Sequence, residues 1–195
     1  MIAVVDTGGA NLASIGNALE RLGERWQLTS DAATIRGARH IILPGVGAAG
    51  ASMTRLRSLG LDALLPTVEQ PVLGICLGMQ LLFAHSAEDE VACLGVIDAP
   101  VVAMTPSPGV RVPHMGWNRV QSRGDTPLLQ GIDDGSPFYF VHSFCAADGP
   151  WVVAECDHGG TIAAIVQREN FYGCQFHPER SGDQGAHLLR NFLAL

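Results

Sequence analysis

Lysine is absent from the 195 residues of this chain, so all twelve basic side chains are arginines. Mechanisms that depend on a lysine amine, as a Schiff base or as a general base, are therefore excluded. Long apolar runs are absent too, because no stretch reaches the ~18 residues that predict a membrane-spanning helix. The first residues lack the basic and apolar regions of a signal peptide, and we expect a cytoplasmic protein without membrane contacts.

Cysteine and positive charge are both scarce. The chain has five cysteines, an odd number, and none belongs to a C-x-x-C motif. This pattern argues against a disulfide framework or a structural zinc site and favours free thiols in a reducing compartment. The formal net charge is −7 and no basic cluster occurs, so we do not expect nucleic acid as a partner.

The residues that are present indicate a globular α/β protein, with 47% hydrophobic and 16% charged residues. Apolar runs, such as 2–6 and 71–76, alternate with amphipathic stretches, which predicts a mostly parallel sheet between two layers of helices. From about Val91 short strands follow one another and indicate antiparallel additions to the sheet. The amphipathic stretch 182–195 predicts a closing helix. We therefore expect one domain, residues 1–195, built as a three-layer sandwich.

One strand-to-helix junction is unusually rich in glycine. The strand "PVLGIC" (71–76) meets the predicted helix "LGMQLLFAHS" (77–86) through Gly74-Ile75-Cys76-Leu77-Gly78. Glycines two residues before and after Cys76 leave room for a sharp turn, as in a nucleophile elbow. A thiol held there would lie at the carboxyl end of a strand and at a helix N-terminus, which favours the thiolate. The backbone N–H of Leu77 would face an oxyanion formed by attack.

The bend alone leaves two interpretations open. Free cysteines are among the most buried residues and usually serve as packing. We apply that interpretation to Cys93, Cys145, Cys156 and Cys174. For Cys76 the G-x-C-x-G spacing makes chemistry about as plausible as packing, and partner residues are needed to decide.

The stretch "FYGCQFHPERSG" supplies such partners. A strand through Phe176 would end at Pro178, which cannot donate to a sheet. His177 would then point out of the carboxyl edge, and Glu179, beyond the rigid proline, could fold back towards its imidazole. A carboxylate that orients a base beside a thiol is the general arrangement of a catalytic triad. A capped turn with a packed histidine is the other interpretation, but a thiol at a bend in the same domain favours the triad.

The stretch 40–45 predicts a strand that Pro44-Gly45 ends, and the glycine-rich loop Pro44-Gly45-Val46-Gly47 begins there. Such a loop can bring backbone N–H groups close to a ligand, as an oxyanion hole requires. A simple strand-ending turn is the alternative. No G-K-[ST] follows the loop, so it is not a phosphate-binding loop.

Two motifs identify a family. "GICLGMQLLF" together with "FHPE" resembles the class I (triad) glutamine amidotransferases. Three further segments, "LPGVGA", "RVPHMGWNRV" and "FYFVHSF", resemble the glutaminase subunits of imidazole glycerol phosphate synthases. The resemblance extends over essentially the whole chain and implies a flavodoxin-like α/β fold. It also implies that Cys76 is the nucleophile, that His177 is the general base and acid, and that Glu179 orients it.

The same resemblance implies roles for residues outside the triad. They form three groups, namely an oxyanion hole, a glutamine site and a partner surface. The oxyanion hole would contain Val46, Gly47 and Leu77. The glutamine site would contain Gly45, Gln80, Ser143 and Phe144. The partner surface would contain Asn11 and Trp117.

The implied reaction is hydrolysis of glutamine to glutamate and ammonia, without a metal or a cofactor. The ammonia would pass to a cyclase subunit with a (β/α)8 barrel, which forms a heterodimer with this chain. That subunit would make imidazole glycerol phosphate and aminoimidazole carboxamide ribotide in histidine biosynthesis. The alternatives are a glutaminase subunit of another synthase, such as pyridoxal phosphate synthase or anthranilate synthase, a stand-alone cysteine hydrolase, and an inactive binding subunit. Trp117 could also be packing, and Gln80 a solvated helix residue.

Overall fold

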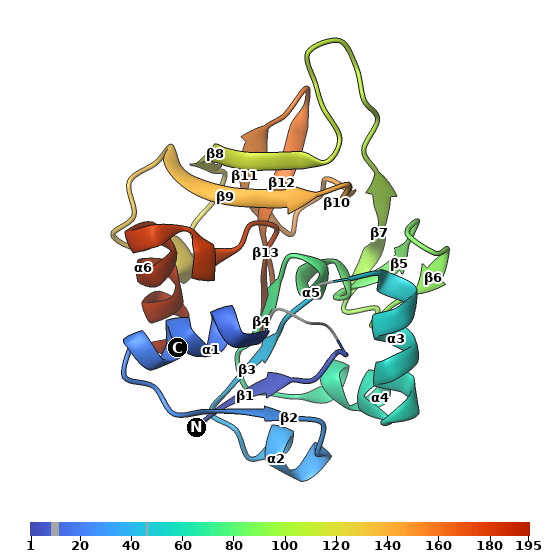
Figure 1. Cartoon of the computed structure of the whole chain (residues 1–195), viewed down its shortest axis with the longest axis vertical. Helices are drawn as coiled ribbons and strands as arrows, with labels where there is room; N and C mark the ends of the chain where they lie inside the picture. Colours follow the sequence, from blue (N-terminus) through green and yellow to red (C-terminus); the bar gives the residue numbers. More distant parts are fainter. Residues whose placement is uncertain (9–11, 46) are drawn as a thin grey trace.

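The structure is a computed structural model that describes residues 1–8, 12–45 and 47–195. Within these residues the main sheet has the strand order β2–β1–β3–β4–β13–β12–β11–β8–β9 (Figure 1). Its first half is parallel and consists of β2 (Trp26–Thr29), β1 (Ile2–Val5), β3 (His40–Leu43), β4 (Val72–Ile75) and β13 (Phe171–Cys174). Its second half is antiparallel and consists of β12 (Thr161–Arg168), β11 (Val152–Asp157), β8 (His114–Ser122) and β9 (Ser136–His142).

Helices cover both faces of the parallel half, which confirms the predicted three layers (Figure 1). All four residues of β1 are buried because each face of the strand meets a helix layer. One layer contains α1 (Leu12–Arg21) and α6 (Gly182–Leu193), the latter at the predicted C-terminal position. The other layer contains α2 (Ala32–Arg36), α3 (Ala49–Ser58) and α4 (Leu61–Leu64). Short 3-10 helices are η1 (Leu65–Thr67), η2 (Pro127–Leu129) and η3 (Pro178–Arg180).

A second sheet corrects one prediction. The helix expected over 77–86 is only one turn long, α5 (Leu77–Gln80), and residues Phe83–Ser86 form strand β5 instead. This apolar run suits a buried helix or a buried strand equally, and pairing decides between them. The pairing partners of β5 in the second sheet are β7 (Ile97–Ala103) and β6 (Val91–Ala92), and β10 (Phe144–Ala146) pairs with β7.

The neighbouring positions of β4 and β13 create the functional edge of the sheet. The two strands are nearly a hundred residues apart in sequence, yet they pair in parallel with Ile75 opposite Cys174. Strand β13 ends at Cys174, two residues earlier than the predicted end at Phe176. Because carboxyl ends of parallel strands share one edge, residues 76 and 177 meet there. None of the helices among the described residues is long and apolar enough to cross a membrane.

Candidate active site

Cys76 occupies a strained turn between β4 and α5. Its backbone angles are φ 53° and ψ −111°, a positive φ that non-glycine residues rarely adopt. The residue is 8% exposed. Strain of this kind persists only where the surrounding structure holds it, and it is typical of functional sites. The thiol thus lies at a sharp bend at the carboxyl end of a strand, as the sequence predicted.

The glycines around Cys76 are required by the close packing of three backbone segments. A Cβ on Gly78 would lie 1.8 Å from the carbonyl oxygen of Leu43, and a Cβ on Gly74 would lie 2.6 Å from the carbonyl oxygen of Gly78. A Cβ on Gly45 would lie 2.2 Å from the backbone nitrogen of Gly78. Since the atoms met are backbone atoms that cannot rotate away, Gly45 and the elbow pack against each other only without side chains at these positions.

Replacement of Gly78 by alanine is expected to lower the free energy of unfolding by about 3 kcal/mol or more, because the new methyl group overlaps a strand carbonyl. Urea denaturation followed by circular dichroism measures this change. Gly124→Ala is the matched control, since a Cβ there meets nothing within 4 Å, and its effect should stay within about 0.5 kcal/mol. Equal stability of the two variants would contradict the packing argument.

The helix that follows Cys76 is too short to have the expected dipole. Helix α5 comprises only Leu77–Gln80, so few peptide dipoles add along its axis. The N–H groups of its first turn still lack intrahelical acceptors. Stabilisation of a negative sulfur or oxyanion therefore has to come from those local N–H donors, including that of Leu77, and from neighbouring charged groups.

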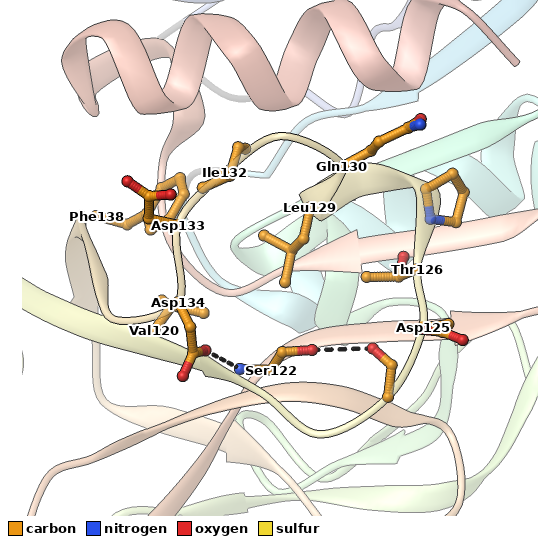
Figure 2. Close-up of a pocket in the computed structure, with 12 residues that line it drawn as sticks. Val120, Ser122, Asp125, Thr126, Leu129, Gln130, Ile132, Asp133, Asp134 and Phe138 are labelled. Atoms are coloured by element: carbon orange, nitrogen blue, oxygen red, sulfur yellow. Dashed lines mark hydrogen bonds between the residues drawn. The ribbon is translucent and has the colours of Figure 1, made fainter.

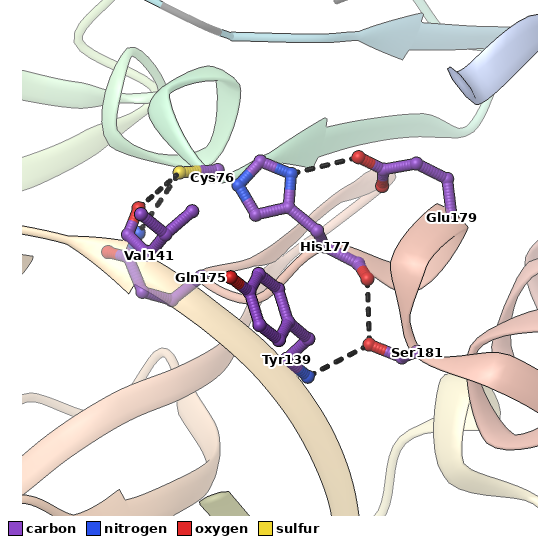
Figure 3. Close-up of polar contacts among 7 residues, drawn as sticks. All are labelled: Cys76, Tyr139, Val141, Gln175, His177, Glu179 and Ser181. Atoms are coloured by element: carbon purple, nitrogen blue, oxygen red, sulfur yellow. Dashed lines mark hydrogen bonds and ion pairs between the residues drawn. The ribbon is translucent and has the colours of Figure 1, made fainter. Parts of the chain in front are cut away.

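The turn that carries His177 is fixed to the neighbouring strand β9. The backbone N–H of His177 donates to the carbonyl oxygen of Tyr139 at 2.9 Å. Ser181 Oγ accepts from the Tyr139 N–H at 3.0 Å and donates to the His177 carbonyl oxygen at 2.7 Å (Figure 3). Ser181 is buried, so water does not compete for these bonds. The position of the imidazole is thereby set by backbone atoms of β9.

The His177 imidazole lies between the side chains of Cys76 and Glu179 (Figure 3). Its Nδ1 donates to Glu179 Oε1 at 2.9 Å, and the Glu179 side chain is 2% exposed. Burial alone would lower the pKa of His177, but hydrogen bonds and attraction from Cys76 and Glu179 outweigh it and raise that pKa to about 10. The ring is therefore protonated at neutral pH, and it can stabilise a thiolate and later donate a proton.

A cavity of about 430 Å³ opens onto the thiol. Most residues that the sequence assigned to the site line this cavity, and five further lining residues were not assigned to it. The predicted ones are Gly45, Gly47, Cys76, Leu77, Gln80, Ser143, Phe144 and His177, and the others are Glu88, Pro113, Val141, His142 and Arg180. Glu179 stands behind His177 and does not line the cavity.

Among the described residues, the predicted partner residue Trp117 also does not line this cavity. Trp117 lies on β8 and is 58% exposed, with its ring edge-on to Tyr139 at a centroid distance of 6.0 Å. Trp117 is therefore not a core residue of this chain. Val46 and Asn11 lie outside the described residues.

Comparisons with known proteins place the chain in a family. A model of the family "Glutamine amidotransferase class-I" matches residues 3–195. The chain is similar to "Imidazole glycerol phosphate synthase subunit HisH" of Xanthomonas oryzae pv. oryzae (strain MAFF 311018), with 52% identity over 194 residues, 100% of this chain and 97% of that protein. The protein of the same name from Xylella fastidiosa (strain Temecula1 / ATCC 700964) is 50% identical with the same coverage. The chain belongs to the HisH family of class I glutamine amidotransferases.

A solved structure supports the fold of this amidotransferase independently. A crystal structure described as that of a glutamine amidotransferase has a TM-score of 0.76 and 19% sequence identity, and the match covers 99% of this chain and 97% of the other. At that identity the likeness concerns the fold alone. It agrees with the three-layer α/β architecture described above.

Gln175 and Glu88 are among the polar residues at the site of the amidotransferase that the sequence analysis missed. Gln175, fully buried, accepts from Gln80 Nε2 at 3.0 Å, and its own Nε2 is 3.8 Å from Cys76 Sγ. Glu88 lines the cavity and accepts from the N–H of Ala49 at 2.8 Å. A glutamine inside the apolar run before His177 was a usable signal. The acidic turn that contains Glu88 gave none, because only tertiary packing brings it to the site.

A second cavity of about 410 Å³ lies beside the loop 124–134 (Figure 2). Its lining has three carboxylates, Asp125, Asp133 and Asp134, but neither a cysteine nor a histidine nor an arginine. Asp134 already accepts from the N–H of Ser122 at 2.7 Å. This cavity therefore lacks the thiol and the base that acyl transfer needs. Among the described residues, no group of three or more His, Cys, Asp or Glu side chains could hold a metal ion.

Proposed function

We propose that this chain, as one domain of residues 1–195, hydrolyses glutamine to glutamate and ammonia and delivers the ammonia to a separate cyclase subunit. The observation that carries the proposal is the line of Cys76, His177 and Glu179 at the 430 Å³ cavity. The family and the printed names of the relatives support histidine biosynthesis as the pathway. The cytoplasm is the compartment in which the free thiols would persist.

The reaction begins with attack of the Cys76 thiolate on the side-chain amide carbon of glutamine. His177, a protonated imidazole held by Glu179, donates its proton to the departing nitrogen, and the C–N bond breaks to leave a glutamyl thioester. The neutral imidazole then takes a proton from water, which attacks the thioester. Glutamate leaves, and the thiolate and the protonated imidazole are restored.

The tetrahedral intermediate carries a negative oxygen that needs backbone donors. The N–H of Leu77 is one donor, and the loop residues Val46 and Gly47 are proposed as the opposite half of the oxyanion hole. One such donor contributes about two to three orders of magnitude in rate. The contact between Gly45 and Gly78 holds this loop against the elbow.

Binding of glutamine uses the polar groups of the cavity. Both hydrogens of Gln80 Nε2 are engaged by Phe144 O at 2.9 Å and by Gln175 Oε1 at 3.0 Å, so Gln80 offers its Oε1 to the substrate. The Glu88 carboxylate is a suitable acceptor for an ammonium group. Gly45, Ser143 and Phe144 complete the contacts with the substrate.

The partner surface is proposed to include Trp117 and Asn11. Trp117 and its neighbour Met115, 64% exposed, form an apolar surface on β8 beside the cavity. Exposed large apolar groups that gather next to an active site are typical of protein interfaces. We propose a (β/α)8-barrel cyclase as the partner in a heterodimer, so that ammonia does not escape into water.

The test measures glutamate release by the purified chain alone and mixed with the cyclase subunit and its ribonucleotide substrate. We expect hydrolysis in the mixture and much slower hydrolysis by the chain alone. Equal rates would overturn the partner dependence. Absence of glutamate release in the mixture, or activation by the synthase subunit of another pathway instead, would overturn the proposed function.

A further inference from the structure

Two buried histidines take no part in the proposed reaction. His114 on β8 and His142 on β9 are directly opposite each other in the strand pair, and they are 3% and 6% exposed. A hydrogen bond of 2.9 Å joins His114 Nδ1 to His142 Nε2. A neutral imidazole has one donor and one acceptor nitrogen, so two facing rings need one definite arrangement of protons.

The groups at the ends of the pair determine that arrangement. The carbonyl oxygen of Phe144 only accepts, so His142 Nδ1, 2.8 Å away, donates to it. His142 Nε2 is then the acceptor of the neutral ring, and His114 Nδ1 donates to it. His114 Nε2 accepts in turn from Asn118 Nδ2 at 3.2 Å. Burial lowers the pKa of His114 to about 3 and that of His142 to about 4, so both rings are neutral at physiological pH.

Aromatic neighbours restrict rotation of the His114 ring. It is stacked between Phe140, at a centroid distance of 4.7 Å, and His158, at 4.0 Å. His158 Nε2 is bonded to the carbonyl oxygen of Arg111 at 2.8 Å, which is outside the chain of bonds just described. The stack and the hydrogen bonds together hold the pair in one orientation.

One end of this hydrogen-bonded chain lies in the glutamine cavity. Phe144 O accepts both from His142 Nδ1 and from Gln80 Nε2, at 2.8 and 2.9 Å. Gln80 continues to Gln175, whose amide lies 3.8 Å from Cys76 Sγ. Because the carbonyl receives the Gln80 N–H, its position determines which way the Gln80 amide faces the substrate.

We propose that His114 and His142 are positioning residues, a neutral pair with fixed tautomers that holds the Phe144 carbonyl and the Gln80 amide in the orientation that binds glutamine. The inference rests on the proposed function, because it concerns the same cavity. The other end of the pair reaches Asn118, next to the exposed Trp117 in sequence, so the pair also connects the β8 surface with the substrate site.

Nitrogen NMR of the unmodified protein tests the tautomers without any assay of activity. Long-range ¹H–¹⁵N correlation of the imidazoles at neutral pH should show the proton on Nδ1 of both His114 and His142. A proton on Nε2 of either ring, or a cationic ring, would overturn the proposal. This measurement does not depend on glutamine hydrolysis, so it distinguishes failure of the inference from failure of the proposed function.

Substitution of His142 tests the positioning role, with glutaminase kinetics measured in the complex with the cyclase. His142→Phe removes the donor to Phe144 O and should raise the KM for glutamine about tenfold or more with a smaller change in kcat. His142→Asn keeps an N–H at the Nδ1 position and should restore most of the affinity. A folded His142→Phe protein with unchanged KM would overturn the proposal.

His158→Phe is the matched control for the cluster. It retains an aromatic ring against His114 and removes only the bond to Arg111 O, so the KM for glutamine should stay within about twofold. If His158→Phe raised the KM for glutamine as much as His142→Phe does, the effect would come from general packing of the cluster, and the positioning role would be overturned.

Discussion

Cys76→Ser should lower glutamine hydrolysis by about four orders of magnitude or more while leaving the protein folded. A serine hydroxyl is similar in size to the thiol, so the strained turn at φ 53° and the cavity are retained. The hydroxyl does not ionise at neutral pH, so the variant lacks the thiolate that attacks the amide carbon. The measurement is glutamate release in the complex with the cyclase.

Ammonia supplied directly should restore synthesis by the complex of the Cys76→Ser variant, because the partner then needs no glutamine. Cys93→Ser is the matched control, since Cys93 lies outside the cavity and burial raises the pKa of its thiol to about 11. It should hydrolyse glutamine at the unmodified rate. Loss of ammonia-dependent synthesis in Cys76→Ser would contradict the delivery of ammonia from this site to a separate synthase.

Glu179→Gln should lower kcat by about 10⁴-fold, as removal of the orienting carboxylate does in other triads. The carboxylate accepts from His177 Nδ1 at 2.9 Å, and an amide of the same shape has no charge to stabilise the imidazolium. The pKa of His177 should fall from about 10, because burial lowers it and one of the two groups that raise it is lost. NMR titration of the His177 ring measures that shift.

The same pKa has a consequence for stability. Since the pKa of His177 in the folded protein exceeds the ordinary value of 6.5, its contribution to stability is fully present below about pH 6.5 and is lost as pH rises through 10. In Glu179→Gln this contribution to stability should be lost at a lower pH, because the pKa of His177 in the folded variant is lower. Glu69→Gln, at an exposed position, is the control and should change neither kcat nor this pH dependence. An unshifted His177 titration in Glu179→Gln would contradict the assigned role.

Local spacing was sufficient to predict the bend at Cys76 and its partners. Gly74 and Gly78 predicted a turn without room for side chains, and their hypothetical Cβ atoms do overlap backbone atoms. Pro178 indicated that Glu179 could fold back towards His177, and the two side chains are hydrogen-bonded although the strand ends earlier, at Cys174. These features depend on a few neighbouring residues, and for that reason sequence reasoning found them.

Features that depend on distant pairing were not predictable in the same way. The apolar run that leads into residues 83–86 suits a helix or a strand, and pairing with β6 and β7 makes Phe83–Ser86 a strand. The dipole expected for a longer helix was wrong for the same reason. Glu88 reaches the site only through the packing of segments far apart in sequence, which no local pattern records.

Mass spectrometry of the protein after exposure to a glutamine-analogue electrophile tests most directly whether Cys76 is the nucleophile. Burial raises the pKa of the thiols of Cys93, Cys145, Cys156 and Cys174, so these four cysteines serve as internal controls. We expect one adduct per chain, on Cys76, and its formation should be prevented by glutamine but not by peptides. An adduct on another cysteine, or labelling of Cys76 that glutamine does not prevent, would contradict the account.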